Sequence, residues 1–266
     1  MCGIVGYVGE RRAAPVILEG LRRLEYRGYD SAGLAVLAGD HVDTVRRVGH
    51  VAALLAAVPP ELEGTTAIGH TRWATHGGVT EANAHPHLDA TNRIALAHNG
   101  IIENHTTLRA RLEEEGVKFR SETDTEVLGH LVHKFYTGDP EAAVKTALGL
   151  VQGTYGIAVI FAEHPGVIIA ARNGSPLVVG KGNGETFLAS DPHALSAHTR
   201  EVVYLEDRDI VRIEANGWTI SRMDGGGVSR VVEVLGEEWE DEGTGDFSHH
   251  MLKEIHEQPE SLARCL

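Results

Sequence analysis

The residue with the clearest chemical potential is a cysteine at the second position of the chain, Cys2. Once Met1 is removed, this cysteine carries a free α-amino group with a pKa of about 8, far below that of a lysine. Such an amine can act as the general base for the thiol of its own residue, as in enzymes with an N-terminal threonine nucleophile. The alternative is an inert cysteine at the start of a strand, because free cysteines are commonly buried.

Two polar segments could supply partners for that thiol. Residues 70–78 (HTRWATHGG) contain Arg72, whose guanidinium can bind a carboxylate through two parallel hydrogen bonds, next to Trp73. Farther along, the side-chain amide of Asn99 and the backbone N–H of Gly100 could form an oxyanion hole, worth about 2.7–4 kcal/mol per donor. Each segment also has a purely structural interpretation, as a surface loop around a packed tryptophan and as an Asn-Gly turn.

A third segment, residues 121–126 (SETDTE), precedes an apolar stretch with helical spacing. Thr123 and Glu126 have the spacing of a capping box, which predicts a helix beginning here. Asp124 is a candidate for binding a substrate ammonium group. Both interpretations can hold together, because only one of these residues needs to cap the helix.

Histidine is dense in the same part of the chain, at positions 70, 76, 85, 87, 98 and 105. His85 and His87 could chelate a metal ion, but the chain has no His-Glu-x-x-His or Cys-x-x-Cys motif. We therefore expect no metal site. The chain also lacks the Gly-x-x-x-x-Gly-Lys-Ser/Thr and Gly-x-Ser-x-Gly motifs, which disfavours a P-loop enzyme and an α/β serine hydrolase.

The spacing of apolar residues predicts the elements that must position these side chains. Helices are predicted at residues 14–24, 51–58, 106–115 and 124–136 and from Pro140 onward. Strands are predicted at residues 2–8, 33–38, 42–48, 66–71, 93–98, 155–162, 167–172, 177–180, 186–189, 202–205, 209–215, 218–223 and 228–235. Gly28 is expected to end the first helix, and Asn216 with Gly217 is a strong hairpin signal. Consecutive hairpins imply antiparallel pairing and thus an α+β fold with two antiparallel sheets, not a parallel Rossmann-type sheet.

Composition limits the partners. The chain has 266 residues and a formal net charge of −14, which argues against nucleic acid or an anionic membrane surface as a main partner. No apolar run reaches the ~18 residues of a transmembrane helix. Two cysteines, Cys2 and Cys265, cannot form a disulfide framework, so we expect a cytoplasmic protein with reduced thiols.

Taken together, the motifs resemble a known family. They are residues 2–7 (CGIVGY), 24–33 (LEYRGYDSAG), 70–77 (HTRWATHG), 83–87 (NAHPH), 98–104 (HNGIIEN), 121–126 (SETDTE) and 253–259 (KEIHEQP). From Cys2 to about Pro259 the chain resembles the N-terminal glutaminase domain of the glucosamine-6-phosphate synthases, the isomerising glutamine–fructose-6-phosphate aminotransferases. The first motif alone would indicate only a class II glutamine amidotransferase. The second and last motifs favour this family over amidophosphoribosyltransferases and asparagine synthetases.

The resemblance implies an N-terminal nucleophile (Ntn) hydrolase fold, a four-layer αββα sandwich, with neither a metal nor an organic cofactor. It implies that Cys2 attacks the side-chain amide of L-glutamine and forms a γ-glutamyl thioester, while its own amino group moves the protons. Asn99 and Gly100 would hold the oxyanion. Arg27 resembles a family arginine near the nucleophile and is a candidate for binding the substrate.

The resemblance also assigns the substrate contacts. Arg72 would bind the α-carboxylate of glutamine, helped by Thr75 and His76, and Asp124 would bind the α-ammonium group. Trp73 would belong to a loop that closes over the bound glutamine. A fixed cation and a fixed anion would select the zwitterionic end and leave the amide at the nucleophile.

We expect two regions, a glutaminase domain at residues 2–235 and an acidic linker at 236–266 that begins the connection to sugar-isomerase domains binding fructose-6-phosphate. Within the second region, residues 249–258 predict a short helix and Pro259 the start of another. The expected reaction is hydrolysis of glutamine to glutamate and ammonia. Two alternatives stay open, a non-catalytic glutamine-binding or regulatory module that keeps Met1, and the glutaminase half of another class II amidotransferase.

Overall fold

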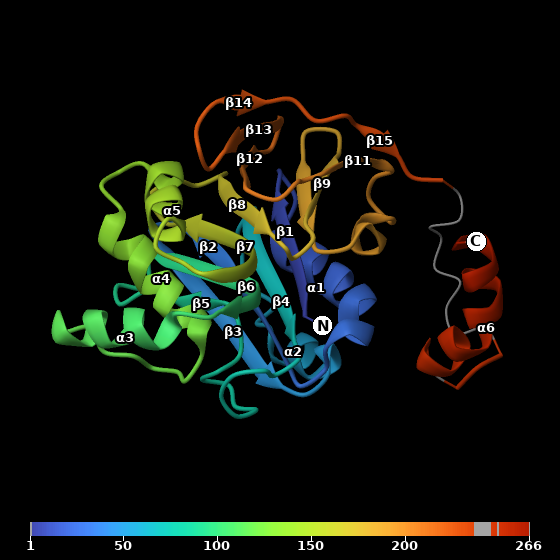
Figure 1. The fold of residues 1–266 in the computed structure, drawn as a ribbon, viewed down its shortest axis with the longest axis horizontal. Coiled ribbons are helices and arrows are strands. Elements are labelled where there is room, and N and C mark those ends of the chain that lie inside the picture. The colour runs from blue at the N-terminus through green and yellow to red at the C-terminus, as the bar shows by residue number, and fades with distance from the viewer. Residues whose placement is uncertain (1, 237–245, 249, 266) are drawn as a thin grey trace.

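Two antiparallel β-sheets face each other in the computed structural model, and helices cover the outer face of each sheet (Figure 1). The structure describes residues 2–236, 246–248 and 250–265. This is the four-layer αββα arrangement expected of an Ntn hydrolase fold, and it confirms the predicted α+β class.

The first sheet places the N-terminal strand near its centre. Its eight strands lie in the order β15 (Glu233–Val234), β11 (Glu201–Tyr204), β9 (Val178–Lys181), β10 (Thr186–Ala189), β1 (Gly3–Val8), β4 (Thr66–Arg72), β2 (Ser31–Ala38) and β3 (His41–Val48). Gly3 is opposite Thr71 in the β1–β4 ladder. Cys2, which directly precedes β1, is therefore held beside the end of β4, where Arg72 lies.

The second sheet has seven strands. Their order is β14 (Gly227–Val228), β13 (Gly217–Arg222), β12 (Asp209–Glu214), β8 (Ile168–Asn173), β7 (Gly153–Phe161), β6 (Ile94–Ile102) and β5 (His87–Leu88). The inner faces of the two sheets share an apolar core that includes Ile4 and Ile68 from one sheet and Ala97 and Ile160 from the other. Packing of these side chains fixes β6 against β1 and β4.

Two further cores attach the helices. The helices α1 (Ala13–Leu24) and α2 (Val51–Ala57) pack on the first sheet, and α3 (His105–Glu114), α4 (Asp124–Phe135) and α5 (Pro140–Leu148) pack on the second. Ile17, Leu21 and Leu24 of α1 recur at helical spacing and are fully buried, as the sequence predicted. Two short 3₁₀ turns, Glu25–Arg27 and Pro192–Leu195, complete the order of elements. Among the described residues, no helix combines the length and apolar character needed to cross a bilayer.

Gly28 does not end the first helix as predicted. The 3₁₀ turn Glu25–Arg27 follows α1, and Gly28 has an extended backbone with φ of −176°. A Cβ atom at this position would lie 2.7 Å from the carbonyl carbon of Arg72 and 2.8 Å from the nitrogen of Trp73. Glycine is needed here because the backbone after β4 passes too close for a side chain.

Two strand-level predictions also need correction. Residues 228–235 do not form one strand, because β14 pairs with β13 in the second sheet and β15 pairs with β11 in the first. Between them Arg230 donates to the buried carboxylate of Asp209 at 2.8 and 2.9 Å, which holds the segment as it crosses between the sheets. The predicted hairpin joins β12 to β13, but Gly217 pairs with Glu214, so the two turn residues are Ala215 and Asn216.

The C-terminal helix differs as well. The predicted break at Pro259 is absent, because α6 (His250–Cys265) continues through this proline. The φ angle of proline suits a helix, although its missing N–H removes one backbone hydrogen bond. Of the predicted linker at residues 236–266, residues 237–245, 249 and 266 lie outside the described residues.

Candidate active site

Four separate segments of the chain meet around one cavity of about 270 Å³, counted with its open mouth. They are the start of β1, the end of β4 with its following loop, the middle of β6, and the beginning of α4. The lining residues are Cys2, Arg72, Trp73, Thr75, His76, His85, His98, Gly100, Thr123, Asp124 and Thr125. Seven of the nine site residues expected from the sequence therefore line one cavity, and Asn99 and Arg27 are the exceptions.

The thiol of Cys2 contacts the backbone of Trp73. The Trp73 N–H donates to Cys2 Sγ at 3.3 Å, and the thiol lies 3.5 Å from the Trp73 carbonyl oxygen, to which it can donate. Burial raises the pKa of the Cys2 thiol above its ordinary value. The sulfur is therefore protonated at rest near neutral pH, and a base must remove its proton before it can attack.

Asn99 and Gly100 lie next to this thiol because β6 of the second sheet faces β1 of the first. The Asn99 side chain does not line the cavity, but its Nδ2 donates to the carbonyl oxygen of Cys2 at 3.2 Å. Gly100 lines the cavity with φ of +133°, and a Cβ atom there would lie 2.1 Å from the Thr154 carbonyl oxygen. Glycine at this position therefore permits a backbone that ordinary residues rarely adopt and a close contact with the neighbouring strand β7.

Arg72 supplies the positive charge of the cavity. Its Nη1 donates to the Gly78 carbonyl oxygen at 3.1 Å, and its Nη2 donates to the His76 carbonyl oxygen. In the described part of the chain, its hydrogen bonds thus go to main-chain oxygens of the following loop, not to a carboxylate. Burial lowers the pKa of Arg72, but a guanidinium remains protonated at physiological pH.

Asp124 supplies the negative charge, from the first residue of α4. Its Oδ2 accepts from the backbone N–H of Ile102 at 2.8 Å, which leaves the second carboxylate oxygen available to the cavity. The Thr123 side chain caps the helix, accepting from the Glu126 N–H at 3.3 Å. Asp124 is therefore free to bind a ligand.

The predicted capping box is only half formed. The Glu126 carboxylate does not accept from Thr123 but from the backbone N–H and hydroxyl of Ser121, both at 2.6 Å, and from the Arg120 N–H at 2.7 Å. Burial raises the pKa of Glu126, yet hydrogen bonds from His130, Ser121 and the backbone lower it more, so the net shift is downward. The ionised carboxylate ties residues 120 and 121 to the first turn of α4.

The loop after β4 carries the remaining expected contacts. Thr75 and His76 line the cavity, and within the described part of the chain the buried Nδ1 of His76 has no hydrogen-bond partner. The Trp73 side chain is 46% exposed and meets the ring of Tyr29 edge-on, with centroids 5.8 Å apart. The Asp30 carboxylate accepts from the Ala74 N–H at 2.8 Å and so anchors the start of this loop.

Arg27 does not line the cavity. Its guanidinium forms an ion pair with Asp191 at 2.9 Å and donates to the Ser190 carbonyl oxygen at 3.3 Å. The role that the resemblance gave to Arg27 stays a prediction.

Sequence reasoning did not select several residues that the structure brings to the site. His85, His98, Thr123 and Thr125 also line the cavity. The density of histidine between positions 70 and 105 was the available signal, but it suggested only a metal. In the described chain, no group of three or more histidine, cysteine, aspartate or glutamate side chains is arranged to hold a metal ion.

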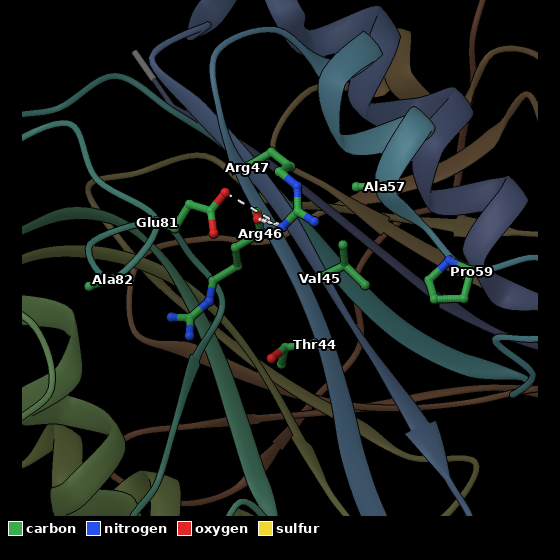
Figure 2. A pocket seen from close by; sticks show the side chains of 8 residues that line it. All are labelled: Thr44, Val45, Arg46, Arg47, Ala57, Pro59, Glu81 and Ala82. Atoms are coloured by element: carbon green, nitrogen blue, oxygen red, sulfur yellow. Dashed lines mark hydrogen bonds and ion pairs between the residues drawn. The ribbon is translucent and has the colours of Figure 1, made fainter.

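A second hollow, of about 750 Å³, lies along β3, the edge strand of the first sheet, and Figure 2 shows its lining. Arg47 extends from β3 and pairs with Glu81 at 3.5 Å, and it also donates to the Arg46 carbonyl oxygen. Among the described residues, no thiol, hydroxyl–histidine pair or carboxylate pair lines this hollow. Of these two cavities, the one at Cys2 is lined by a thiol, a guanidinium and a carboxylate together.

Comparison with known proteins identifies the family that the chain resembles. Residues 70–197 match the family model described as a glutamine amidotransferase domain. Over its whole length the chain is 53% identical to a glutamine–fructose-6-phosphate aminotransferase [isomerizing] of Thermus thermophilus and 50% identical to that of Idiomarina loihiensis. It spans 44% of the length of each of these relatives.

Solved structures show the same likeness. A glutamine phosphoribosylpyrophosphate amidotransferase from B. subtilis, complexed with ADP and GMP, superposes with a TM-score of 0.73 at 26% identity. A structure described as the allosteric regulatory enzyme of purine biosynthesis gives a TM-score of 0.73 at 29% identity. Each superposition covers 84% of this chain and 49% of the other.

Proposed function

The chain belongs to the class II glutamine amidotransferase family, and from this premise we propose that it hydrolyses L-glutamine to glutamate and ammonia through a thioester on Cys2. The observation that carries the proposal is one cavity in which a half-buried thiol lies with an arginine from the end of β4 and an aspartate from the start of α4. Free glutamine offers a carboxylate, an ammonium group and an amide in one short molecule, and these three groups match the three protein groups.

Binding orients the substrate. Arg72 takes the α-carboxylate, to which a guanidinium can donate two parallel hydrogen bonds, and Asp124 takes the α-ammonium group. With both ends of the zwitterion fixed, the side-chain amide is held at Cys2, and the attack becomes in effect intramolecular. Thr75 and His76 complete the wall around the carboxylate.

The chemical steps follow from the position of Cys2. The α-amino group of residue 2, free once Met1 is removed, takes the thiol proton as sulfur bonds to the amide carbon. Asn99 Nδ2 and the Gly100 N–H donate to the resulting oxyanion. The same amine gives its proton to the leaving nitrogen, so ammonia departs and a γ-glutamyl thioester remains. Water, deprotonated by the amine, then attacks the thioester carbonyl, and its oxygen becomes part of the glutamate carboxylate while Cys2 regains its proton.

The whole protein would use the ammonia. Because the relatives are named as glutamine–fructose-6-phosphate aminotransferases, we extend the proposal to ammonia supply for amination of fructose-6-phosphate, in cytoplasmic hexosamine synthesis. Sugar-isomerase domains would provide the acceptor site, with residues 2–235 as the glutaminase domain and 236–266 as the connection. Trp73 would close over bound glutamine and shelter the thioester from early hydrolysis.

The test is glutamate release from L-glutamine by the purified chain beside a Cys2→Ala variant, with the intact mass of each sample. We expect turnover by the chain that has lost Met1 and none by the variant, while glutamine still binds to both. Turnover by a clean Cys2→Ala preparation would disprove the nucleophile. Glutamine binding without turnover, in a chain that retains Met1, would support the non-catalytic regulatory module.

A further inference from the structure

One buried histidine contacts the proposed oxyanion donor without lining the cavity. His70 lies in β4, has no exposed surface, and places its Nε2 3.0 Å from Asn99 Oδ1. The same nitrogen lies 3.1 Å from the carbonyl oxygen of His98. A carbonyl oxygen can only accept a hydrogen bond, so Nε2 must carry the hydrogen.

The protonation of His70 fixes the orientation of the Asn99 amide. An N–H at His70 Nε2 requires the amide oxygen, not the amide nitrogen, to face it. The opposite orientation would point the amide N–H₂ at the ring N–H and the amide oxygen at the Cys2 carbonyl, which are two repulsive contacts. The observed orientation turns Nδ2 to the Cys2 carbonyl at 3.2 Å, beside the thiol.

The other ring nitrogen shows that His70 is neutral. His70 Nδ1 is buried and has no hydrogen-bond partner among the described residues, and the ring packs on His85 with centroids 4.3 Å apart. Burial lowers the pKa of His70 to about 3, with hydrogen bonds to Asn99 and the His98 carbonyl opposing the shift. A neutral imidazole has one N–H, and here the His98 carbonyl places it on Nε2.

We propose that His70 is a positioning residue, which holds the Asn99 amide so that its N–H₂ group is directed to the oxyanion formed at Cys2. The inference rests on the proposed glutaminase activity and adds to it a role for a residue that never touches the substrate. The His98 carbonyl determines which nitrogen of His70 carries the hydrogen, and that N–H in turn determines which way the Asn99 amide is oriented. Because the oxyanion exists only in the transition state, the effect should appear in kcat and not in glutamine binding.

The test compares two substitutions, His70→Gln and His70→Asn, whose side-chain amides lie at different distances from the backbone. Glutamine can place an N–H near the position of Nε2, whereas asparagine reaches only as far as Nδ1. We expect His70→Gln to keep most of the kcat and His70→Asn to lose about 10–100-fold, the loss typical when a residue that orients a first contact is removed. If His70→Asn does not fold, His70→Met fills the ring volume without a donor and takes its place.

A double-mutant cycle separates positioning from general destabilisation. Asn99→Ala alone should lower kcat by about 10²–10³. In that background His70→Asn should cause little further loss, because a residue that acts through Asn99 has nothing left to orient. Glutamine affinity, measured by calorimetry in Cys2→Ala and in Cys2→Ala/His70→Asn, should be equal. His198→Gln, which alters a histidine that stacks on Phe187 away from the cavity and whose side chain is 10% exposed, is the control and should leave kcat unchanged.

Other results would overturn the inference. Equal kcat values for a folded His70→Asn and the unaltered chain would show that Asn99 needs no such support. Full additivity with Asn99→Ala, or loss of glutamine affinity, would show that His70 acts on the fold or on binding. If the unaltered chain, free of Met1, releases no glutamate, the proposed function itself fails. That outcome is distinct from the results that would overturn only the role of His70.

Discussion

At the scale of single residues, the candidate site keeps two opposite charges apart in one small cavity. Arg72 ends a strand of the first sheet, and Asp124 begins a helix that packs on the second. Each is held by the backbone, through carbonyl oxygens of the following loop for Arg72 and through the Ile102 N–H for Asp124. Because these anchors leave the charges free for a ligand, the pair is suited to a zwitterion and not to an uncharged amide.

Changing Asp124 to asparagine should separate binding from chemistry. The asparagine side chain would keep an oxygen for the Ile102 N–H and lose only the negative charge. A hydrogen bond to a charged group contributes about 1.5–3 kcal/mol, so we expect KM for glutamine to rise by about 10–100-fold. The kcat should change little, because the ammonium group of glutamine does not react. Steady-state kinetics with glutamine measure both values.

The matched control for this prediction is Glu114→Gln on the exposed end of α3, which removes the same charge away from the cavity. Its KM should equal that of the unaltered chain. An unchanged KM for Asp124→Asn would contradict the ammonium-binding role, and an equal rise in both variants would indicate a long-range charge effect.

Residue types in their motifs were enough to select Cys2, Arg72 and Asp124, because thiol, guanidinium and carboxylate chemistry can be recognised in a sequence. They were not enough to select His70, since its importance comes from two carbonyl-type oxygens on β6, a strand of the other sheet. Arg27 shows the same limit. Its ion pair with Asp191 joins segments far apart in the chain, and no local pattern predicts that contact.

At the scale of elements, two backbones pass close to each other where the loop after β4 begins. Gly28 lies against the junction of Arg72 and Trp73, and the neighbouring Asp30 N–H donates to the Arg72 carbonyl oxygen at 3.1 Å. The Trp73 backbone in turn holds the thiol of Cys2. A change at Gly28 should therefore be transmitted to the nucleophile.

We expect Gly28→Ala to lower both stability and kcat/KM. Its extended backbone suits alanine, so strain in φ is not the cause. The added methyl group would instead meet main-chain atoms at 2.7–2.8 Å, and the loop must shift to admit it. Overpacking of this kind typically costs about 1–3 kcal/mol. Thermal or urea unfolding and steady-state kinetics measure the two effects.

Gly129→Ala is the control for this substitution. Gly129 lies inside α4, and a Cβ atom there would meet nothing within 4 Å. Alanine is favoured over glycine inside a helix by about 0.5–1 kcal/mol, so this variant should be slightly more stable and equally active. A Gly28→Ala variant that behaves like Gly129→Ala would show that the loop does not depend on this close approach.

Periodicity predicted most elements to within a few residues, because each sheet and helix buries one face against a core. Periodicity gave a wrong prediction where contacts between distant segments outweigh the local spacing of apolar residues. Residues 228–235 alternate as a single strand would, yet the ion pair between Arg230 and Asp209 holds the chain between two sheets. The capping box was half correct for a similar reason, since the Glu126 carboxylate finds better donors at Arg120 and Ser121 than at Thr123.

At the scale of the whole molecule, packing of the two sheets on each other and of α4 on the second sheet creates a buried environment that no single element has alone. Four buried histidines lie there, His70 on β4, His98 on β6, and His85 and His87 on the segment that enters β5. The rings of His70 and His85 lie 4.3 Å apart, and those of His85 and His87 lie 4.8 Å apart. Burial lowers the pKa of each of the four histidines. The folded state therefore holds them neutral.

These histidines should make the stability of the fold depend on pH in a defined direction. In the unfolded chain each has a pKa of about 6.5, so below that pH the unfolded state binds more protons than the folded state. The free energy of unfolding is then complete above pH 6.5 and falls as the pH drops, by up to about 2 kcal/mol per histidine at pH 5. Carboxylates, with pKa values of about 4, contribute little in this window.

We expect denaturant unfolding between pH 7.5 and 5 to show this fall, and His87→Gln to reduce its slope. His87 Nε2 lies 2.9 Å from Thr123 Oγ1, and glutamine can keep that hydrogen bond while removing the titrating group. His41→Gln is the control and should not reduce the slope, because His41 is exposed and its hydrogen bond with Asp40 raises its pKa. A slope unchanged in His87→Gln would mean that the buried rings take up protons without unfolding. The buried space between the second sheet and α4 would then tolerate a charge on the ring of His87, which the low dielectric of that space opposes.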